Sequence, residues 1–327
     1  MRPASWKITT SADELREGLF GQIVLWIFEL LPYLHGKGIF PIWDIKSRAY
    51  GTEPDYTVMP GVFDLAYSPS DRAHETVDFL TLRHAHVSVL GGDWEYVNGL
   101  WHSYFRVPDR THAAADQVSL PPNSLGLHYR GTDKNLNSRH TNPVSGDDFL
   151  TLVEDFLKNH PDVRSVFLAT DELSFVDKAR RRFPPLGVIN LGEVDFHKAS
   201  RNRPHKGDRA LLDCVLLSRC RYVLKCSSAL SAFAKVLNPR LESYRVSASK
   251  LFTDIPYFPD AYIPKLTSTD PECRRILERQ LANDWLDEPY ARARFGKPFR
   301  TQSRYRASVR LKKWIRAQIA RNAGGIA

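Results

Sequence analysis

Residues 124–134 read SLGLHYRGTDK, a short apolar stretch that ends abruptly in charged and polar side chains. Residues 124–129 have the length and composition of a buried strand, so the pattern predicts a strand followed by a loop rich in hydrogen-bonding groups. Beyond it, strand-like segments alternate with amphipathic stretches of ten to fourteen residues. We predict strands at 124–129, 163–169, 187–191, 221–225 and 241–246, and helices at 147–160, 174–183, 208–220 and 228–237. This alternation is typical of βαβ units with a parallel sheet.

The same alternation indicates one Rossmann-like domain over residues 122–265, preceded by a less regular α/β domain over residues 1–121. The remaining residues, 266–327, are interpreted as a C-terminal helical segment with a basic tail. In the first domain we predict local structure as follows: an apolar helix at 23–34, a strand at 39–45, loops at 50–71, a helix at 72–86, and a short helix with a Pro-rich linker at 87–120.

The chain has 327 residues, of which 43% are apolar and 25% are charged, as expected of a globular protein with about two domains. A chain of this length buries a large core and needs no disulfide or metal to fold. Its four cysteines lack the spacing of a zinc site or a disulfide framework, which favours buried thiols.

The net charge of +9 is confined to the tail, because eleven Lys and Arg and no acidic residue lie between residue 291 and the end. The other 35 Lys and Arg and 37 Asp and Glu leave residues 1–290 with a net charge of −2. A folded surface that binds nucleic acid is basic, so this distribution argues against a nucleic-acid partner.

No secretory signal and no membrane-spanning stretch is visible, so we expect a cytoplasmic protein. Within the tail, residues 304–322 place Leu311, Trp314, Ile315 and Ile319 at helical spacing among basic residues. Such a helix suits peripheral contact with the anionic inner face of a membrane. The alternatives are a C-terminal helix packed on the body and a solvated tail.

Ligands of parallel sheets bind beyond the carboxyl ends of the strands, which singles out the loops at 128–139, 169–173 and 225–229. In the first loop, the Arg130 guanidinium matches the geometry of a phosphate. With Asp133 and Lys134 it predicts a diphosphate clamp, and the alternative is a solvated turn with a local ion pair.

The other loops are less specific. Asp171 could bind a ribose or base, hold a backbone turn, or cap the helix that follows. Ser227 and Ser228 stand where a strand becomes a helix, and could form an anion site or simply cap that helix. Asp213 lies in an apolar helix, where a carboxylate makes a structural hydrogen bond or contacts a ligand. The segment Gly18–Gln22 (GLFGQ) could supply a second anion or sugar contact, or only end a loop.

Several motifs are absent from the sequence. It has no GxxxxGK[ST] of P-loop kinases and sulfotransferases, no GxGxxG after a strand, no HExxH and no metal-holding DxD triplet.

Four segments together resemble the fucosyltransferase superfamily, which includes α1,6-fucosyltransferases, rhizobial nodulation fucosyltransferases and protein O-fucosyltransferases. His128–Lys134 (HYRGTDK) is similar to the H-x-R-R-T-D-K motif of that superfamily, and Phe167–Asp171 (FLATD) is similar to its Y-x-A-T-D-D strand end. Leu212–Asp213 with Leu217–Ser218 and the later Ser-Ser loop resembles the third motif, and Gly18–Gln22 resembles the glycine-rich loop near the start of the first domain. The motifs occur in the same order over roughly residues 15–240.

The resemblance implies a GT-B fold with two Rossmann-like domains facing across a cleft. It implies GDP-fucose as donor, a glycan or glycolipid acceptor, and inverting transfer with no cofactor and no metal ion. Arg130 would hold the β-phosphate and stabilise the departing GDP. The other roles implied are these: Asp133 and Lys134 shape the clamp, His128 and Asp213 contact the guanosine, Ser227 and Ser228 hold the phosphates, and Asp171, Phe20, Gly21 and Gln22 complete the donor site.

The chain departs from the superfamily pattern at two positions. Gly131 replaces the second Arg of H-x-R-R, so one positive charge is missing. Ser138 stands where the α1,6-fucosyltransferases carry a Glu that is a candidate base, which leaves the general base unassigned. A weak base suffices where the transition state is oxocarbenium-like. The alternative functions are transfer from another nucleotide sugar on the same fold, and a non-catalytic protein that binds membranes or polyanions.

Overall fold

A computed structural model of the chain describes residues 6–10, 19–20, 30–46, 57–59, 61–69, 75–78, 94–131, 144–192, 206–226, 228–246 and 251–253. The chain divides into two compact units, Met1–Pro259 and Asp260–Ala327, and every described residue belongs to the first. The predicted C-terminal segment at 266–327, with its membrane-binding helix at 304–322, therefore lies outside the described residues. The predicted domain boundaries at 121 and 265 stay predictions.

The larger sheet has the topology of a Rossmann domain. Its strands are β7 (Leu125–Tyr129), β8 (Ser165–Thr170), β9 (Gly187–Ile189), β10 (Tyr222–Lys225), β11 (Glu242–Val246) and β12 (Leu251–Thr253). Their order is β12-β11-β10-β7-β8-β9, and all neighbours are parallel except the edge strand β12. In the sheet, β8 and β9 lie on one side of β7, and β10 and β11, which come later in the sequence, lie on its other side. The strand order therefore reverses between β7 and β10, which is where such sheets bind ligands.

Four helices connect these strands: α6 (Gly146–Asn159), α7 (Leu173–Arg182), α8 (Lys206–Arg219) and α9 (Ala229–Leu237). Every predicted strand and helix between residues 122 and 246 is confirmed, with ends shifted by at most two residues. The antiparallel edge strand β12 was not predicted. The first turn of α6 contains the two predicted acids, Asp147 and Asp148. Ser145 caps this helix, because its Oγ accepts the Asp148 N–H at 3.1 Å.

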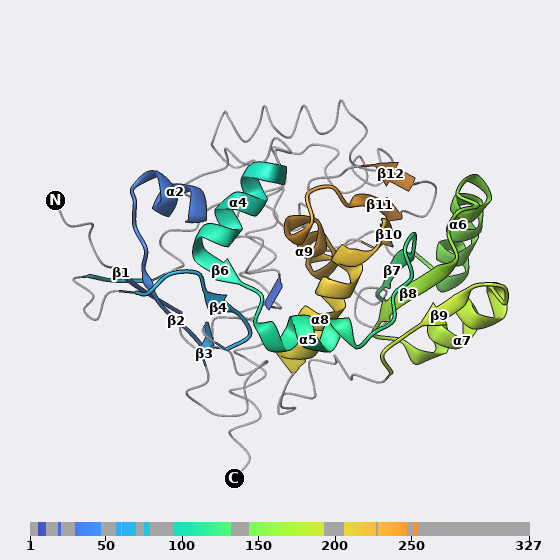
Figure 1. Cartoon of the computed structure of the whole chain (residues 1–327), viewed down its shortest axis with the longest axis horizontal. Coiled ribbons are helices and arrows are strands. Elements are labelled where there is room, and N and C mark those ends of the chain that lie inside the picture. Colours follow the sequence, from blue (N-terminus) through green and yellow to red (C-terminus); the bar gives the residue numbers. More distant parts are fainter. Residues whose placement is uncertain are drawn as a thin grey trace, which may run out of the picture. The chain divides into compact units, whose positions relative to one another are not determined.

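Alternate residues of β7 face opposite layers of helices. Leu125, Leu127 and Tyr129 join the core that β7, β8 and β10 form with α6 and α7. Gly126 and His128 face the other way, toward α8 and α9. Figure 1 shows α8 and α9 on one side of this sheet and α6 and α7 on the other. A Cβ on Gly126 would lie 2.9 Å from Leu217 Cδ2, so the glycine permits the close approach of α8 to the sheet.

The smaller sheet has the order β3-β2-β1-β5. Its strands are β1 (Trp6–Thr10), β2 (Ile42–Lys46), β3 (Thr57–Met59) and β5 (Glu75–Asp78), and β1 is parallel to both β2 and β5. The helix α2 (Leu31–Gly36) ends just before β2, so the end of the predicted apolar helix and the strand after it are both confirmed, while residues 21–29 lie outside the described residues.

Three predictions for the first domain were wrong. Residues 75–78 form strand β5 where a helix was predicted at 72–86, because pairing with β1 overrides a weak local preference. The predicted loops at 50–71 contain β3 and also β4 (Asp64–Leu65), which pairs with β6 (Phe105–Arg106). The predicted short helix and linker at 87–120 contains two helices, α4 (Trp94–Tyr104) and α5 (Asp109–Asp116).

The helices α4 and α5 pack against α9 and α8 through aromatic rings and polar contacts. The Phe233 ring of α9 lies 4.8 Å from Trp101 of α4 and 5.7 Å from Phe63, measured between ring centroids. Asn98 Nδ2 donates to the Val236 carbonyl at 2.8 Å. The helix whose N-terminus follows β10 is thus buried against the first part of the chain.

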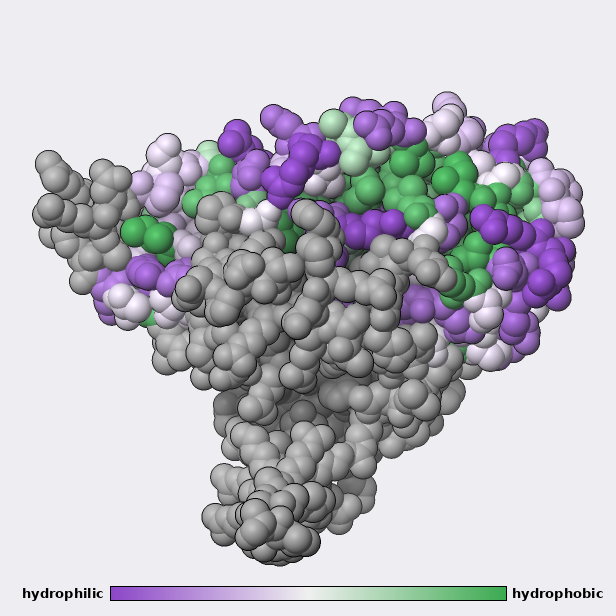
Figure 2. All heavy atoms as spheres, turned by 90° about the horizontal axis from the view of Figure 1, so that it is seen from below, coloured by the Kyte–Doolittle hydropathy of each residue, from purple (hydrophilic) through white to green (hydrophobic). Residues whose placement is uncertain are grey.

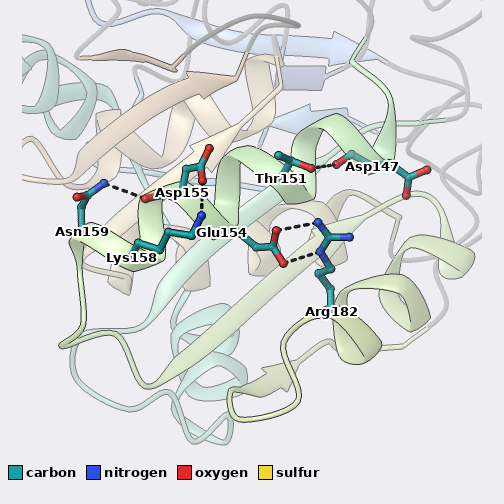
Figure 3. A network of polar contacts seen from close by, with 7 residues as sticks. All are labelled: Asp147, Thr151, Glu154, Asp155, Lys158, Asn159 and Arg182. Atoms are coloured by element: carbon teal, nitrogen blue, oxygen red, sulfur yellow. Dashed lines mark hydrogen bonds and ion pairs between the residues drawn. The ribbon is translucent and has the colours of Figure 1, made fainter.

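An exposed polar network joins α6 to α7 (Figure 3). Arg182 on α7 donates two hydrogen bonds to the Glu154 carboxylate on α6, the one from Nη2 measuring 2.7 Å. Figure 2 shows hydrophilic residues gathered at the end of the molecule that α6 and α7 occupy in Figure 1. Exposed pairs of this kind contribute little stability, so this network adds little to the fold.

Among the described residues, no helix has both the length and the apolar character that crossing a membrane requires.

Candidate functional site

The polar residues singled out in the sequence converge on the carboxyl ends of β7, β8 and β10. β7 ends at Tyr129 and is followed by Arg130, β8 ends at Thr170 and is followed by Asp171, and β10 ends at Lys225. The Cys226 N–H donates to the His128 carbonyl at 3.0 Å, which ties the loop after β10 to the end of β7. These ends adjoin the reversal of strand order, so the fold places the predicted residues where a ligand is expected.

Arg130 is held by the buried carboxylate of Asp171. Asp171 Oδ2 lies 3.5 Å from Arg130 Nε, while Oδ1 accepts the Gly131 N–H at 3.1 Å. The Asp171 side chain is 6% exposed and that of Arg130 is 28% exposed. Of the alternatives for Asp171, the structure shows the one in which it holds a backbone turn, and in doing so it also positions the guanidinium. The guanidinium is planar and has five N–H donors, a geometry that matches a phosphate.

Gly131 is a glycine because Glu172 occupies the space beside it. A Cβ at position 131 would lie 1.9 Å from Glu172 Oε2 and 2.8 Å from Tyr129 Cε1. Ser174 Oγ donates to Glu172 Oε1 at 2.7 Å. The departure from H-x-R-R at this position therefore has a packing cause, and the loop after β7 carries Arg130 with no second arginine beside it.

His128 is a buried, neutral imidazole. Its ring is 4% exposed, and Nδ1 lies 2.8 Å from Ser231 Oγ on α9. Burial, together with nearby Arg130 and Lys225, holds the pKa of His128 well below its usual range. The Ser231 hydroxyl donates to the Ser228 carbonyl at 3.3 Å, which leaves its lone pairs for an N–H from Nδ1. With the hydroxyl proton directed to that carbonyl, Nδ1 carries the imidazole proton and Nε2 is an acceptor.

Ser228 occupies the N-cap position of α9 but does not cap the helix with its side chain. Its residue is 2% exposed, its backbone is extended, and its hydroxyl makes no capping hydrogen bond. Ser228 Oγ is buried with no hydrogen-bond partner within the part of the chain that the structure describes. Simple capping, which was one of the two alternatives for this serine, is therefore wrong. A buried hydroxyl at a helix N-terminus is available to an anion.

Asp213 lies on α8, close to the first turn of α9. The residue is 5% exposed, and its Oδ1 is 3.5 Å from Arg209 Nε. Burial raises the pKa of Asp213 from 3.8 to about 6, against the opposing influence of Arg209. The next residue, Cys214, donates through its thiol to the Leu230 carbonyl at 3.0 Å, which anchors this turn of α8 to α9.

Phe20 packs in the core, where its ring lies 5.6 Å from that of Phe233 on α9. This contact places Phe20 against α9, where its ring takes part in packing. The remaining predicted site residues lie outside the described residues: Asp133, Lys134, Ser227, Gly21 and Gln22, together with Ser138 at the position of the missing base.

Two residues near the site were not singled out by sequence reasoning. Ser231 on α9 lies 2.8 Å from His128 Nδ1 and fixes the His128 ring. Lys225 ends β10 in register with His128 and is 3% exposed. The signal for Lys225 is present in the sequence, because a lysine that closes an apolar strand just before a Ser-Ser loop is unusual for a buried position.

The thiols of Cys214, Cys220 and Cys226 are free and buried, as predicted. Burial raises the pKa of all three, that of Cys226 to about 11, so none is a thiolate at neutral pH.

Comparison with known proteins gives structural matches alone. No protein-family model matches the chain, and no curated protein matches its sequence. Fucosyltransferase NodZ from Bradyrhizobium superposes with a TM-score of 0.51 at 16% identity, over 77% of this chain and 99% of that one. NodZ α-1,6-fucosyltransferase soaked with GDP-fucose gives 0.50 at 17% identity, over 76% and 98% of the two chains. POFUT1 in complex with GDP is more distant, with a TM-score of 0.46 at 10% identity over 75% and 99%.

The chain therefore has a mixed α/β fold of the GT-B type with parallel sheets, as the motifs implied. More narrowly, its fold is fucosyltransferase-like and is shared with NodZ along nearly the whole NodZ chain.

Proposed function

We propose that this protein is a glycosyltransferase that transfers fucose from GDP-fucose to a glycan or glycolipid acceptor, with inversion and without a metal ion. One observation carries the proposal. On a NodZ-like fold, the Asp171-held guanidinium of Arg130 and the buried hydroxyl of Ser228 lie at the strand ends that flank the reversal between β7 and β10. Cation, hydroxyl and helix N-terminus are the groups that bind phosphate in proteins.

The diphosphate is assigned to Arg130 and to the start of α9. As the bond between the fucose C1 and the β-phosphate oxygen breaks, its electron pair stays on that oxygen and GDP leaves as the anion. Arg130 donates to this developing charge, and its guanidinium is already oriented by Asp171 before the reaction. Ser228, with Ser227 and the first N–H groups of α9, would hold the remaining phosphate oxygens.

The guanosine is assigned to His128 and Asp213. The unprotonated Nε2 of His128 accepts a hydrogen bond, which suits a ribose hydroxyl and does not suit a phosphate oxygen. The Asp213 carboxylate accepts the N–H groups of a guanine edge. Both side chains are buried, and buried acceptors of this kind strongly discriminate against a base that lacks the matching donors.

The acceptor oxygen attacks C1 from the face opposite GDP and loses its proton to a weak base. Asp133 and Lys134, which belong to the same loop as Arg130, are proposed to shape the clamp around the diphosphate. The experiment is GDP release from GDP-fucose, with an acceptor supplied, by the wild type and by Arg130→Ala. We expect the variant to be slower by on the order of a hundredfold. Equal rates would refute the assignment.

The alternative that the donor is another nucleotide sugar can be tested on the same protein. Thermal-shift measurements with GDP-, UDP- and dTDP-sugars separate the donors, since a ligand at about 100 times its Kd stabilises by about 2.7 kcal/mol. A larger shift of the melting temperature with a UDP- or dTDP-sugar than with GDP-fucose would show that the donor is not GDP-fucose, and it would leave the fold assignment unchanged.

The basic residues at 304–322 are proposed to hold the enzyme at an anionic membrane surface, an inference from sequence alone. Sedimentation with anionic liposomes, with and without residues 300–327, tests it. Equal pelleting of the two chains would eliminate this role.

A further inference from the structure

Lys225 is a buried cation on the second of the two strands that flank the reversal of strand order. It is the last residue of β10, is 3% exposed, and stands in register with His128 of β7. The register and the alternation of the strands put Lys225 on the same face of the sheet as His128, under α8 and α9. An ionised lysine is rarely buried to this extent without a specific role.

We propose that Lys225 is the second cation of the donor site and that it contacts the diphosphate together with Arg130, so that the enzyme distinguishes GDP from GMP. The assignment of the nucleotide rests on the proposed function, whereas the pairing of the two cations rests on the geometry of the strand ends.

Three observations support this role. First, Arg130 and Lys225 share their surroundings. The pKa of His128 is lowered by both, after burial, and both also act on the pKa of the Cys226 thiol. The Cys226 N–H bonds to the His128 carbonyl, so the two cations belong to neighbouring strands whose ends are tied together at this point.

Second, the loop after β7 supplies no further cation at position 131, which is a glycine. The Glu172 carboxylate and the Tyr129 ring fill the volume that any side chain at position 131 would enter. A diphosphate carries more than one negative charge, so a single guanidinium leaves part of that charge unmatched. The second positive charge must then come from a neighbouring element, and β10 is the neighbour of β7 at the reversal.

Third, Lys225 is followed by a helix start that has an unused polar group. Ser228, the N-cap residue of α9, is 2% exposed and has a hydroxyl with no hydrogen-bond partner among the described residues. The α9 helix spans nine residues and directs its first N–H groups toward the strand ends. Arg130 after β7, Lys225 at the end of β10 and Ser228 before α9 thus all lie at the same edge of the sheet.

The experiment measures the affinities of GDP and GMP for the full chain by titration calorimetry, in the wild type, Lys225→Met and Lys225→Arg. We expect the ratio of GDP to GMP affinity to fall on the order of tenfold to a hundredfold in Lys225→Met and to be largely kept in Lys225→Arg. The matched control is Lys235→Met. That lysine is also buried, and its Nζ donates to the Leu241 carbonyl at 2.6 Å, beyond the C-terminal end of α9. The control should keep the wild-type ratio.

The ratio is measured within one preparation, so a partly unfolded variant does not change it. If Lys225→Met does not fold, Lys225→Gln replaces it under the same criterion. An unchanged ratio in a neutral variant of Lys225 would overturn the inference. Inorganic pyrophosphate separates this result from a failure of the proposed function. If the wild type binds pyrophosphate but not GDP, and Lys225→Met weakens the binding of pyrophosphate, the two-cation site is retained and the nucleotide assignment is rejected. If the wild type binds neither pyrophosphate nor GDP, both the two-cation site and the proposed function are rejected.

Discussion

The Arg130 guanidinium and the Asp171 carboxylate form a pair in which the buried partner positions the exposed one. Asp171 contacts Nε of Arg130 at 3.5 Å and accepts the N–H of the next residue at 3.1 Å, so a single side chain fixes both the arginine and its backbone. The pair spans the ends of β7 and β8, which are neighbours in the sheet. An arginine that is oriented before the ligand arrives stabilises developing charge without reorganising.

Asp171→Asn tests this positioning role. The substitution keeps the shape and an acceptor for the Gly131 N–H, but removes the charge that holds Arg130. We expect kcat/KM for GDP-fucose to fall by about tenfold to a hundredfold, mainly in kcat, because the guanidinium is then misplaced in the transition state. Asp177→Asn on α7 is the control, since that carboxylate is 64% exposed and pairs with Arg180 on the same helix. Equal kinetics for the two variants would contradict the role of Asp171.

Gly131→Ala is expected to destabilise the protein by about 1–3 kcal/mol, since the new methyl group collides with Glu172 and Tyr129. Glu172 presents the end of a flexible side chain, so removing it should relieve part of the collision. In urea unfolding, the double variant Gly131→Ala with Glu172→Ala should recover on the order of 1 kcal/mol relative to the sum of the single changes. Strictly additive effects would show that Glu172 is not what requires glycine at position 131.

The sequence predicted the Rossmann-like region well because each of its elements is specified locally. Strands such as residues 165–170 and helices such as 146–159 carry their own apolar pattern and their own caps. The first domain was predicted less well. The four residues of β5 have no pattern long enough to exclude a helix, and they become a strand only because β1 lies beside them. Pairing between distant segments is not visible in a local pattern.

In the candidate site, too, local patterns were predictable and long-range contacts were not. Arg130, Asp171 and Ser228 were found because polar residues follow apolar strands, and strand ends have a known place in the fold. The roles they take in the structure depend on partners that are far apart in sequence. His128 is neutral because it meets Ser231 under α9, and Gly131 is required because Glu172 lies beside it. Lys225 carried a local signal as a lysine closing an apolar strand, but only the register of β10 against β7 shows that it lies beside His128.

Metal removal provides a separate test of the charge arrangement. Because Arg130 is proposed to neutralise the leaving diphosphate, we expect the rate of GDP release from GDP-fucose to be unchanged after dialysis against EDTA. The assay compares EDTA-treated enzyme with and without added Mg²⁺ or Mn²⁺. A loss of activity that either ion restores would show that the diphosphate needs a metal as well as Arg130.

The pKa of Asp213 gives a prediction for both stability and binding. Burial raises it from 3.8 to about 6, so ionising this carboxyl costs stability, and that cost appears as the pH rises from about 4 to 6. Asp213→Asn has no such cost. Its free energy of unfolding relative to wild type should therefore improve on the order of 2 kcal/mol between pH 4 and pH 7. Asp208→Asn is the control, because Asp208 is half-exposed on the same helix and pairs with Arg110 at 3.2 Å. The difference between this control and wild type should change by less than about 0.5 kcal/mol over the same range.

Binding should change in the opposite direction, which separates a ligand role for Asp213 from a structural one. If the ionised carboxylate accepts N–H groups of guanine, GDP affinity of the wild type falls as the pH drops below about 6, because the carboxyl is then protonated and the match to the base is lost. Asp213→Asn should bind GDP more weakly at pH 7 and lose this step between pH 7 and pH 5. A variant that is more stable at pH 7 and binds GDP as tightly as wild type would mean that Asp213 serves only its contact with Arg209.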